Sequence, residues 1–249
     1  MSSNTLYALD FDGVICDSAV ETSLTGWKAA HHFWPKMPAE IPDKLISEFK
    51  RVRPVLETGY EAILILRLLF EGVTTDALLA DFPHRIAGII NRDQLDTNKL
   101  KQHFGETRDR WIDDNLEQWI EMNPLFKGVA DKLTIIPTSD CYIITTKQER
   151  FVSQILNANG IALPSEQIFG LDRQLSKQQV LRDLLNQYPN HTVLFVEDRL
   201  PTLINVMKDE QLASIKLIFA NWGYNTTQDK QKAVELKLKQ IDLNGFSTL

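Results

Sequence analysis

The chain has 249 residues, of which 43% are hydrophobic and 24% charged, a composition typical of globular proteins. Its formal net charge of −6 argues against broad binding to nucleic acids or anionic membranes, because such binding needs clustered Lys and Arg. The two cysteines, Cys16 and Cys141, stand far apart and have no metal-binding spacing. We therefore expect neither a disulfide framework nor a zinc site.

The sequence shows no secretory signal and no membrane span. The first ten residues lack a basic segment followed by a long apolar run. The longest apolar stretch, residues 62–70, contains Arg67 and is about half the length of the roughly 20 residues that cross a bilayer. We therefore expect a cytoplasmic protein. The sequence leaves the oligomeric state open.

The first predicted element is a strand, LYAL (6–9), which runs directly into Asp10-Phe11-Asp12-Gly13. Residues two apart on a strand point to the same side, so both carboxylates can face one site. Two acidic groups this close need a cation, and their oxygen ligands suit Mg²⁺. The same pair can also form a turn or a helix cap. The motif by itself leaves both interpretations open.

Between residues 18 and 124 helical periodicity dominates and no strand is apparent. Residues 57–71 are apolar nearly all round, which predicts a buried helix. A later set of apolar residues is spaced as one face of a long helix would be: Leu100, Phe104, Trp111, Leu116, Trp119 and Ile120. We therefore predict that a helical insertion interrupts the domain directly after its first strand.

From residue 141 onward, short apolar runs alternate with amphipathic segments. The predicted strands are 141–146, 167–169, 192–196 and 215–220, and the predicted helices are 148–158, 176–187, 202–212 and 228–240. Asn159-Gly160 is a plausible end for the first of these helices. This alternation predicts an α/β fold with a parallel sheet, in which ligands bind beyond the carboxyl ends of the strands.

Polar residues stand where these later strands end. Thr145-Thr146 offers a hydroxyl and turn amides to phosphate oxygens, and Lys177 begins a helix whose positive end also favours an anion. The strand 192–196 runs into Glu197-Asp198. Lys147 directly follows Thr146. A position near the phosphate is one interpretation, but we prefer that of a solvated residue at a helix start. Each feature is common by itself, whereas the whole series in this order indicates one site.

The order DFDGV, IITT, a lone Lys and VED resembles the four motifs of the haloacid dehalogenase superfamily. Two further segments, LFKGVADKL (125–133) and FANWGY (219–224), are similar to its phosphoglycolate-phosphatase-like branch. The resemblance covers the whole chain. It implies a Rossmann-like α/β catalytic core formed by residues 1–17 and 125–249, and an inserted helical cap domain at 18–124.

The resemblance also implies residue roles. Asp10 would be the nucleophile that forms an aspartyl phosphate and would bind Mg²⁺. Asp12 would be the acid and base, and its backbone carbonyl would also bind the metal. Thr145, Thr146 and Lys177 would hold the phosphoryl oxygens, and Asp198 would be a further metal ligand. Such a set supplies the positioning, charge neutralisation and proton transfer that phosphoryl transfer requires.

The fourth motif departs from the family pattern. Glu197 replaces the usual Gly before Asp198, and Thr202 stands where a second acid is expected. We therefore predict that Glu197 assists Asp198 at the metal.

The substrate would be a small phosphorylated metabolite, such as phosphoglycolate or a sugar phosphate. A role in substrate binding is predicted within the cap for Arg51, Arg53, Tyr60 and Glu61. The alternatives are a phosphomutase, which shares Asp10 and Asp12, and a catalytically silent binding protein, which only Thr202 supports. Asp12 counts against a dehalogenase, because that reaction needs neither Mg²⁺ nor a second acid.

Overall fold

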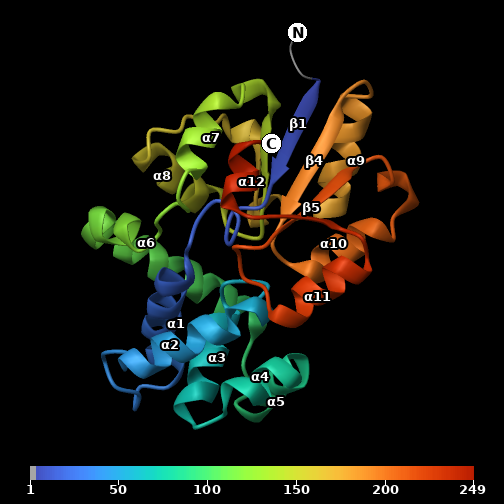
Figure 1. The fold of residues 1–249 in the computed structure, drawn as a ribbon. Coiled ribbons are helices and arrows are strands. Elements are labelled where there is room, and N and C mark those ends of the chain that lie inside the picture. Colours follow the sequence, from blue (N-terminus) through green and yellow to red (C-terminus); the bar gives the residue numbers. More distant parts are fainter. Residues whose placement is uncertain (1–3) are drawn as a thin grey trace. The chain divides into compact units, whose positions relative to one another are not determined.

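The computed structural model describes residues 4–249, which divide into two compact units (Figure 1). One unit comprises the described residues up to Asp17 together with Pro124–Leu249, and the other is Ser18–Asn123. The two chain segments that join the units run side by side within the first unit. Cys16 pairs with Leu125 in an isolated antiparallel bridge, and the Asp17 N–H donates to the Pro124 carbonyl at 2.8 Å.

The first unit is built on one sheet of six parallel strands in the order β3-β2-β1-β4-β5-β6. These strands are β1 (Thr5–Leu9), β2 (Cys141–Ile144), β3 (Ile168–Phe169), β4 (Thr192–Glu197), β5 (Lys216–Ala220) and β6 (Lys239–Ile241). Its helices are α7 (Val129–Ile135), α8 (Glu149–Ala158), α9 (Lys177–Gln187), α10 (Leu200–Met207), α11 (Thr227–Glu235) and α12 (Leu243–Ser247). This arrangement confirms the predicted parallel α/β fold.

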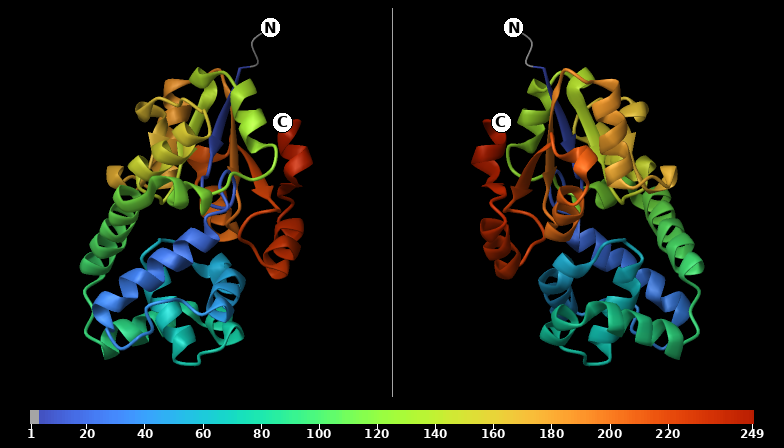
Figure 2. Two further views of the ribbon diagram at one scale, coloured as in Figure 1. Left: turned by 90° about the vertical axis from the view of Figure 1, so that its left-hand side faces the viewer. Right: turned by 90° about the vertical axis from the view of Figure 1, so that its right-hand side faces the viewer.

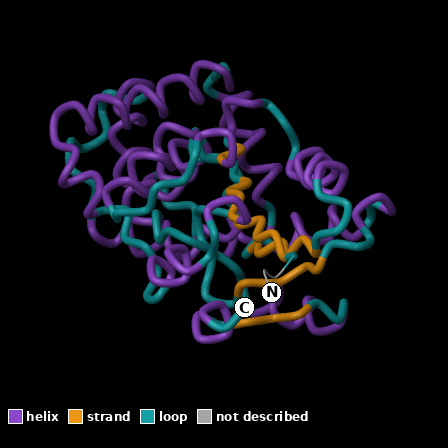
Figure 3. The backbone as a smooth tube through the Cα atoms, turned by 90° about the horizontal axis from the view of Figure 1, so that it is seen from above, coloured by secondary structure: helices purple, strands orange, loops and turns teal. Residues whose placement is uncertain are grey.

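Helices lie on both sides of this sheet (Figure 3). One face packs against α9, α10 and α11, through apolar residues such as Leu181, Leu203 and Ala233. Parallel connections are right-handed, so the reversal of direction after β3 places these helices opposite α7 and α8. Sheets covered in this way are made of nearly continuous apolar runs, which is why β1 and β4 were readable in the sequence.

The prediction of a helix over residues 228–240 is wrong in its carboxyl-terminal part. Helix α11 ends at Glu235, and residues Lys239–Ile241 form the edge strand β6 instead. Lys237 adopts a left-handed conformation with φ of 57°, and the Leu238 N–H donates to the Ala233 carbonyl at 3.0 Å. This is a Schellman ending, which normally uses Gly at the left-handed position. The sequence therefore carried no stop signal there.

The second unit is entirely helical, as the sequence predicts for the insertion. Its helices are α1 (Ala19–Phe33), α2 (Asp43–Val52), α3 (Glu61–Phe70), α4 (Thr75–Ala80), α5 (Phe82–Arg92) and α6 (Thr97–Glu121). Helix α3 is buried nearly all round and supplies much of this unit's core. Figure 2 shows the helices of this unit, coloured blue to green, from two further sides. Among residues 4–249, no helix has the length and apolar character needed to cross a membrane.

Helix α6 is bent, and this corrects the predicted apolar face. Asn115 has non-helical angles (φ −161°, ψ 82°), and its side-chain oxygen accepts the N–H of Gln118 at 3.0 Å. Asn115 thus caps a second helical segment inside the helix. The bend turns Leu116 away from the core, so this side chain is exposed, while Trp111 and Trp119 remain buried.

Candidate active site

Asp10 and Asp12 lie at the carboxyl end of β1, in the middle of the sheet. The Asp10 N–H donates to the Val196 carbonyl of β4 at 3.0 Å, so the ladder continues through this residue. Gly13 then turns the chain with a φ of 97°, a conformation that other residues adopt at a cost. The Asp10 side chain is 8% exposed and that of Asp12 is 17% exposed. The strand end therefore presents Asp12 more openly than Asp10.

Lys177 lies between two acidic groups from different strands. Its ammonium donates to Asp10 Oδ1 at 2.6 Å and to Glu197 Oε2 at 2.7 Å. Lys177 is the first residue of α9, and Ser176 caps that helix by accepting the Gln179 N–H at 3.1 Å. The helix start thus fixes the origin of the lysine side chain. Lys177 therefore lies beside the motif at β1, while its contact with a phosphoryl group stays a prediction.

Three carboxylates at this edge can hold a metal ion. Asp10, Glu197 and Asp198 are all buried, and each offers an oxygen within 4.8 Å of those from the other two. Carboxylate oxygens are the ligands that Mg²⁺ prefers, and it commonly uses only one or two of them with several waters. The Asp12 side chain is not in this group, which is compatible with a contact through its backbone carbonyl alone. The donor set therefore fits Mg²⁺.

Asp198 is fixed by the loop that follows β5. The Tyr224 N–H donates to Asp198 Oδ2 at 2.5 Å, and the Asn225 amide donates to the Asp198 carbonyl at 3.3 Å. Gly13 and Gly223 pack so closely on Asp198 that a Cβ atom at either position would overlap its side chain. The Tyr224 hydroxyl also donates to Asp17 Oδ1 at 2.8 Å. The segment FANWGY thus acts as a scaffold for Asp198.

Burial and neighbouring charges shift the pKa values of Asp10 and Lys177. Burial raises the pKa of Asp10 to about 7, and the neighbouring charge of Glu197 adds to this effect, while Lys177 opposes it. Burial alone would lower the pKa of Lys177, but the charges of Asp10 and Glu197 outweigh it, so this pKa is raised. A divalent cation beside Asp10 would favour its ionised form.

Glu197 has two structural contacts that the sequence did not reveal. Its side chain is completely buried, and one oxygen accepts the Lys177 ammonium. The other oxygen accepts the Arg199 N–H at 3.0 Å, which shapes the turn from β4 into α10. Thr202 is half-buried on α10, where its N–H donates to the Arg199 carbonyl at 3.1 Å. A direct role of Glu197 at the metal stays a prediction.

Thr145 and Thr146 follow β2, the neighbour of β1 in the sheet. Thr145 is buried, and its Oγ1 accepts the Lys147 N–H at 3.1 Å, which leaves its hydroxyl proton available to an anion. Thr146 is half-buried. Both residues lie at the same end of the sheet as Asp10, as the parallel register requires. Their contact with a phosphate stays a prediction.

Lys147 is the residue that sequence reasoning placed wrongly. It is buried, and its ammonium lies 3.1 Å from Asp12 Oδ1. With all four carboxylates of this edge ionised, the two lysines leave a net charge of two negative units, which one Mg²⁺ ion would neutralise. The position of Lys147, two residues beyond Thr145 at a strand end, was the only available signal.

The four predicted substrate residues lie in the helical unit. Arg51 is exposed and pairs with Asp76 at 3.2 Å, whereas Arg53 is buried and donates to the Leu56 carbonyl at 3.3 Å. Glu61 accepts the backbone N–H groups of residues 57 and 58 at 2.7 and 2.9 Å. The Lys101 ammonium lies over the Tyr60 ring, 5.5 Å from the ring centre. Their role in binding a substrate stays a prediction.

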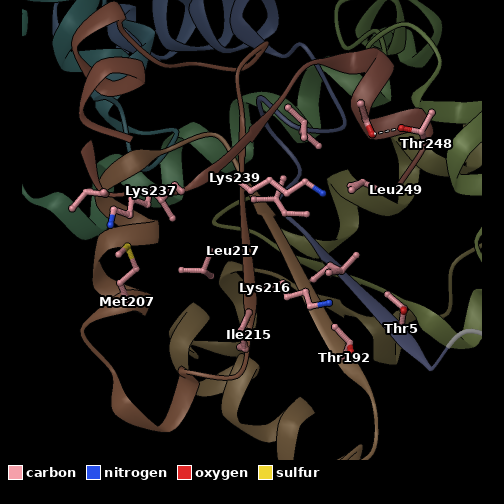
Figure 4. A pocket seen from close by; sticks show the side chains of 16 residues that line it. Thr5, Thr192, Met207, Ile215, Lys216, Leu217, Lys237, Lys239, Thr248 and Leu249 are labelled. Atoms are coloured by element: carbon pink, nitrogen blue, oxygen red, sulfur yellow. Dashed lines mark hydrogen bonds between the residues drawn. The ribbon is translucent and has the colours of Figure 1, made fainter. Parts of the chain in front are cut away.

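A groove of about 800 Å³ lies elsewhere in the first unit, around the amino ends of the strands (Figure 4). Thr5, Thr192 and Lys216 line it at the starts of β1, β4 and β5. The side chains of Lys216 and Lys239 extend toward the same side in Figure 4. None of the predicted site residues lines this groove, so the candidate active site is the opposite, carboxyl edge of the sheet.

Comparison with known proteins shows the fold. No protein-family model matches the chain, and no curated protein matches its sequence. Among solved structures, a predicted phosphoglycolate phosphatase from Haemophilus somnus is similar with a TM-score of 0.57 and 15% identity over 92% of this chain and 93% of that one. A predicted phosphatase from Clostridium acetobutylicum gives a TM-score of 0.55 and 16% identity over 98% and 96% of the two chains.

A haloacid dehalogenase-like hydrolase from Streptococcus pneumoniae gives a TM-score of 0.53 and 14% identity over 96% of this chain and 94% of that one. The similarity to all three structures spans nearly the whole length, including the helical insertion. The chain therefore has the fold of haloacid dehalogenase-like proteins, as its four motifs led us to expect.

Proposed function

We propose that the chain is a Mg²⁺-dependent phosphatase that hydrolyses a small phosphomonoester through an aspartyl phosphate on Asp10. The observation that carries this proposal is the contact of Lys177 with both Asp10 and Glu197, beside Asp198. A carboxylate nucleophile, a fixed ammonium and a site for a divalent cation are the groups that phosphoryl transfer requires. The names of structurally similar phosphatases support the same reaction class.

The side chains account for both halves of the reaction. In the first half, a carboxylate oxygen of Asp10 attacks the phosphorus, the bond to the leaving oxygen breaks, and that oxygen takes a proton from Asp12. In the second half, Asp12 takes a proton from water as the water oxygen attacks the phosphorus. The bond between phosphorus and Asp10 then breaks, which releases phosphate and restores both aspartates.

The remaining residues hold charge in place. Lys177 and the Thr145 hydroxyl would bind the phosphoryl oxygens, which remain negative throughout the transfer. Mg²⁺, held by Asp10 and Asp198, would offset the charge of the phosphoryl group and so allow the Asp10 carboxylate to approach it. We propose phosphoglycolate or a sugar phosphate as the substrate class and the cytoplasm as the location. Both cysteines are buried and neither is part of a disulfide, which supports a reducing compartment.

The test is hydrolysis of 4-nitrophenyl phosphate by the full chain with and without added Mg²⁺. We expect turnover only with Mg²⁺, and its loss in Asp10→Asn, because an amide has nearly the shape of the carboxylate but cannot attack phosphorus. Asp183→Asn, an exposed substitution on the helix that carries Lys177, is the matched control and should keep wild-type activity. Full activity in excess chelator, or in Asp10→Asn, would refute the proposal.

The substrate class is tested next, with a panel of phosphorylated metabolites under the same conditions. We expect phosphoglycolate or a sugar phosphate to have a higher kcat/KM than the aryl phosphate, because contacts to the rest of a natural substrate add transition-state binding. Transfer of the phosphoryl group to a second position on a sugar, without release of phosphate, would instead identify a phosphomutase.

A further inference from the structure

Lys147 differs from Lys177 in what it holds and in how deeply it is buried. Its ammonium lies 3.1 Å from Asp12 Oδ1, and its side chain has no exposed surface, whereas 17% of the Asp12 side chain is exposed. Asp12 is therefore the partner in this pair that solvent can contact. A substrate oxygen can reach Asp12 without reaching Lys147.

The backbone of Lys147 is fixed from three directions. Its N–H donates to Thr145 Oγ1 at 3.1 Å, and its carbonyl accepts the Leu171 N–H at 3.1 Å. Gly170 packs so tightly on it that a Cβ atom at Gly170 would lie 2.6 Å from the Lys147 carbonyl oxygen. A long side chain normally samples many rotamers, and ordering one costs up to about 2 kcal/mol. Here the fixed backbone and full burial restrict the ammonium to one place.

We propose that Lys147 is a positioning residue that holds the Asp12 carboxyl group in the orientation from which it exchanges protons with the leaving oxygen and with water. The proposal rests on the proposed phosphatase function, in which Asp12 is the acid and base. Lys147 itself does not touch the substrate and acts only through Asp12. Its contribution is geometric, because a misplacement of about 1 Å at a catalytic group can cost about 10²-fold in rate.

The experiment compares kcat/KM for phenyl phosphate and 4-nitrophenyl phosphate, with saturating Mg²⁺. The two substrates share the phosphoryl group and differ in how much their leaving oxygen needs a proton. In Lys147→Met we expect kcat/KM to fall about 10²-fold for phenyl phosphate and less than about 10-fold for 4-nitrophenyl phosphate. Lys147→Gln keeps an N–H donor for Asp12 and should retain more phenyl phosphate activity than the Met variant.

A matched control is Lys132→Met. Lys132 is also a buried lysine of the first unit, but its ammonium donates to the Leu249 carbonyl at 2.6 Å, away from the site residues. This substitution should leave the ratio of the two kcat/KM values unchanged. Circular dichroism and thermal melting of each variant confirm that the fold is retained. A change of the ratio in the control would show that the effect is a general one and would overturn the proposal.

The Asp12→Asn background completes the test. If Lys147 acts through Asp12, adding Lys147→Met to Asp12→Asn should change kcat/KM less than about twofold. An equal loss for both substrates in Lys147→Met, or multiplicative losses in the double variant, would show that Lys147 acts on the phosphoryl group and would overturn the proposal alone. A wild-type protein that hydrolyses neither substrate would instead refute the phosphatase function, and this proposal with it.

Discussion

At the level of single side chains, two lysines pair with the two aspartates of the candidate active site. Lys177 holds Asp10 at 2.6 Å and Lys147 holds Asp12 at 3.1 Å, so each aspartate of the first motif has its own ammonium partner. The two pairs differ in environment, since Lys177 also contacts Glu197, whereas the Lys147 side chain has no exposed surface. The arrangement separates Asp10, the proposed nucleophile, from Asp12, the proposed acid and base, although they are only two residues apart.

Asp12→Asn tests this separation directly. We expect kcat/KM for phenyl phosphate to fall by about 10²- to 10⁴-fold, the usual loss when acid and base help is removed. The nitrophenolate of 4-nitrophenyl phosphate leaves without a proton, so Asp10 should still be phosphorylated and the intermediate should accumulate. Intact-protein mass spectrometry after brief mixing would detect it. A normal rate with phenyl phosphate would remove Asp12 from the mechanism.

The sequence was informative about this site where a side chain follows a strand directly. Asp10, Asp12 and Asp198 could be located because each comes at, or just after, the end of a readable apolar run. Lys147 could not, because burial of a lysine depends on Asp12 and Gly170, which are distant in the sequence and meet it only in the fold. The same holds for the contact between Glu197 and Arg199, which depends on how the chain turns after β4.

At the level of elements, two helix ends show what local sequence can reveal. Helix α8 ends in a Schellman motif with Gly160 at a φ of 71°, and the sequence predicted this end correctly. Helix α11 ends in the same motif with Lys237 at a φ of 57°, and there the prediction ran on into β6. Both helices end with the same backbone geometry, but in the sequence only a glycine indicates a helix end of this kind. Strand β6 has three residues, two of them polar, and its identity depends on pairing with β5.

The helical unit contains a buried polar cluster that joins α1 to α6. Arg108 donates to both carboxylate oxygens of Glu21, at 2.8 and 2.6 Å, and the side chains are only 6% and 0% exposed. Glu21 also accepts the Thr25 hydroxyl at 2.6 Å and the Trp119 indole N–H at 3.1 Å. Such a charge is tolerated inside a helical core only while its partners remain in place.

Arg108→Met should therefore destabilise the protein by about 3 to 5 kcal/mol, because it leaves the Glu21 carboxylate buried without its cation. Replacing both residues, as Glu21→Met with Arg108→Met, should cost less than the single change. The control is Lys44→Met, which breaks an exposed pair with Glu48 and should change the free energy of unfolding by less than about 1 kcal/mol. Urea unfolding measures all three. Equal, small effects would show that the cluster contributes little.

At the level of the whole molecule, the sheet order brings residues from distant segments to one edge. β1 lies between β2 and β4, so the residues that follow these three strands meet although more than half of the chain separates them. The negative charge gathered there has a consequence for stability. Without a metal the folded state carries the cost of burying Asp10 among Glu197 and Asp12.

Mg²⁺ should therefore stabilise the protein against heat, and more so at pH 8 than at pH 6. The pKa of Asp10 is raised to about 7 in the folded state, whereas that of an unfolded Asp is near 4. Without a metal, the stability that Asp10 contributes is therefore fully present below about pH 4 and is lost as the pH rises through about 7. Mg²⁺ competes with the proton for this carboxyl group, so binding strengthens over the same range. A concentration 100 times Kd corresponds to about 2.7 kcal/mol.

Differential scanning calorimetry with and without Mg²⁺ measures this effect. Asp198→Asn should abolish most of the shift in Tm, whereas Asp183→Asn on the surface should retain it. A shift that is the same at both pH values, or that survives in Asp198→Asn, would place the metal elsewhere.

The side-by-side segments at Cys16 and Leu125 have a consequence for how such a chain can change over evolutionary time. Because the Asp17 N–H donates to the Pro124 carbonyl, the two ends of the segment Ser18–Asn123 lie side by side, as the two ends of a hairpin loop do. Each doubling of loop length costs only about 0.6 kcal/mol of closure entropy, so size is a weak constraint on what is inserted there. Insertions of different length can therefore be exchanged at this point at little cost in closure entropy, while the residues at the strand ends stay unchanged.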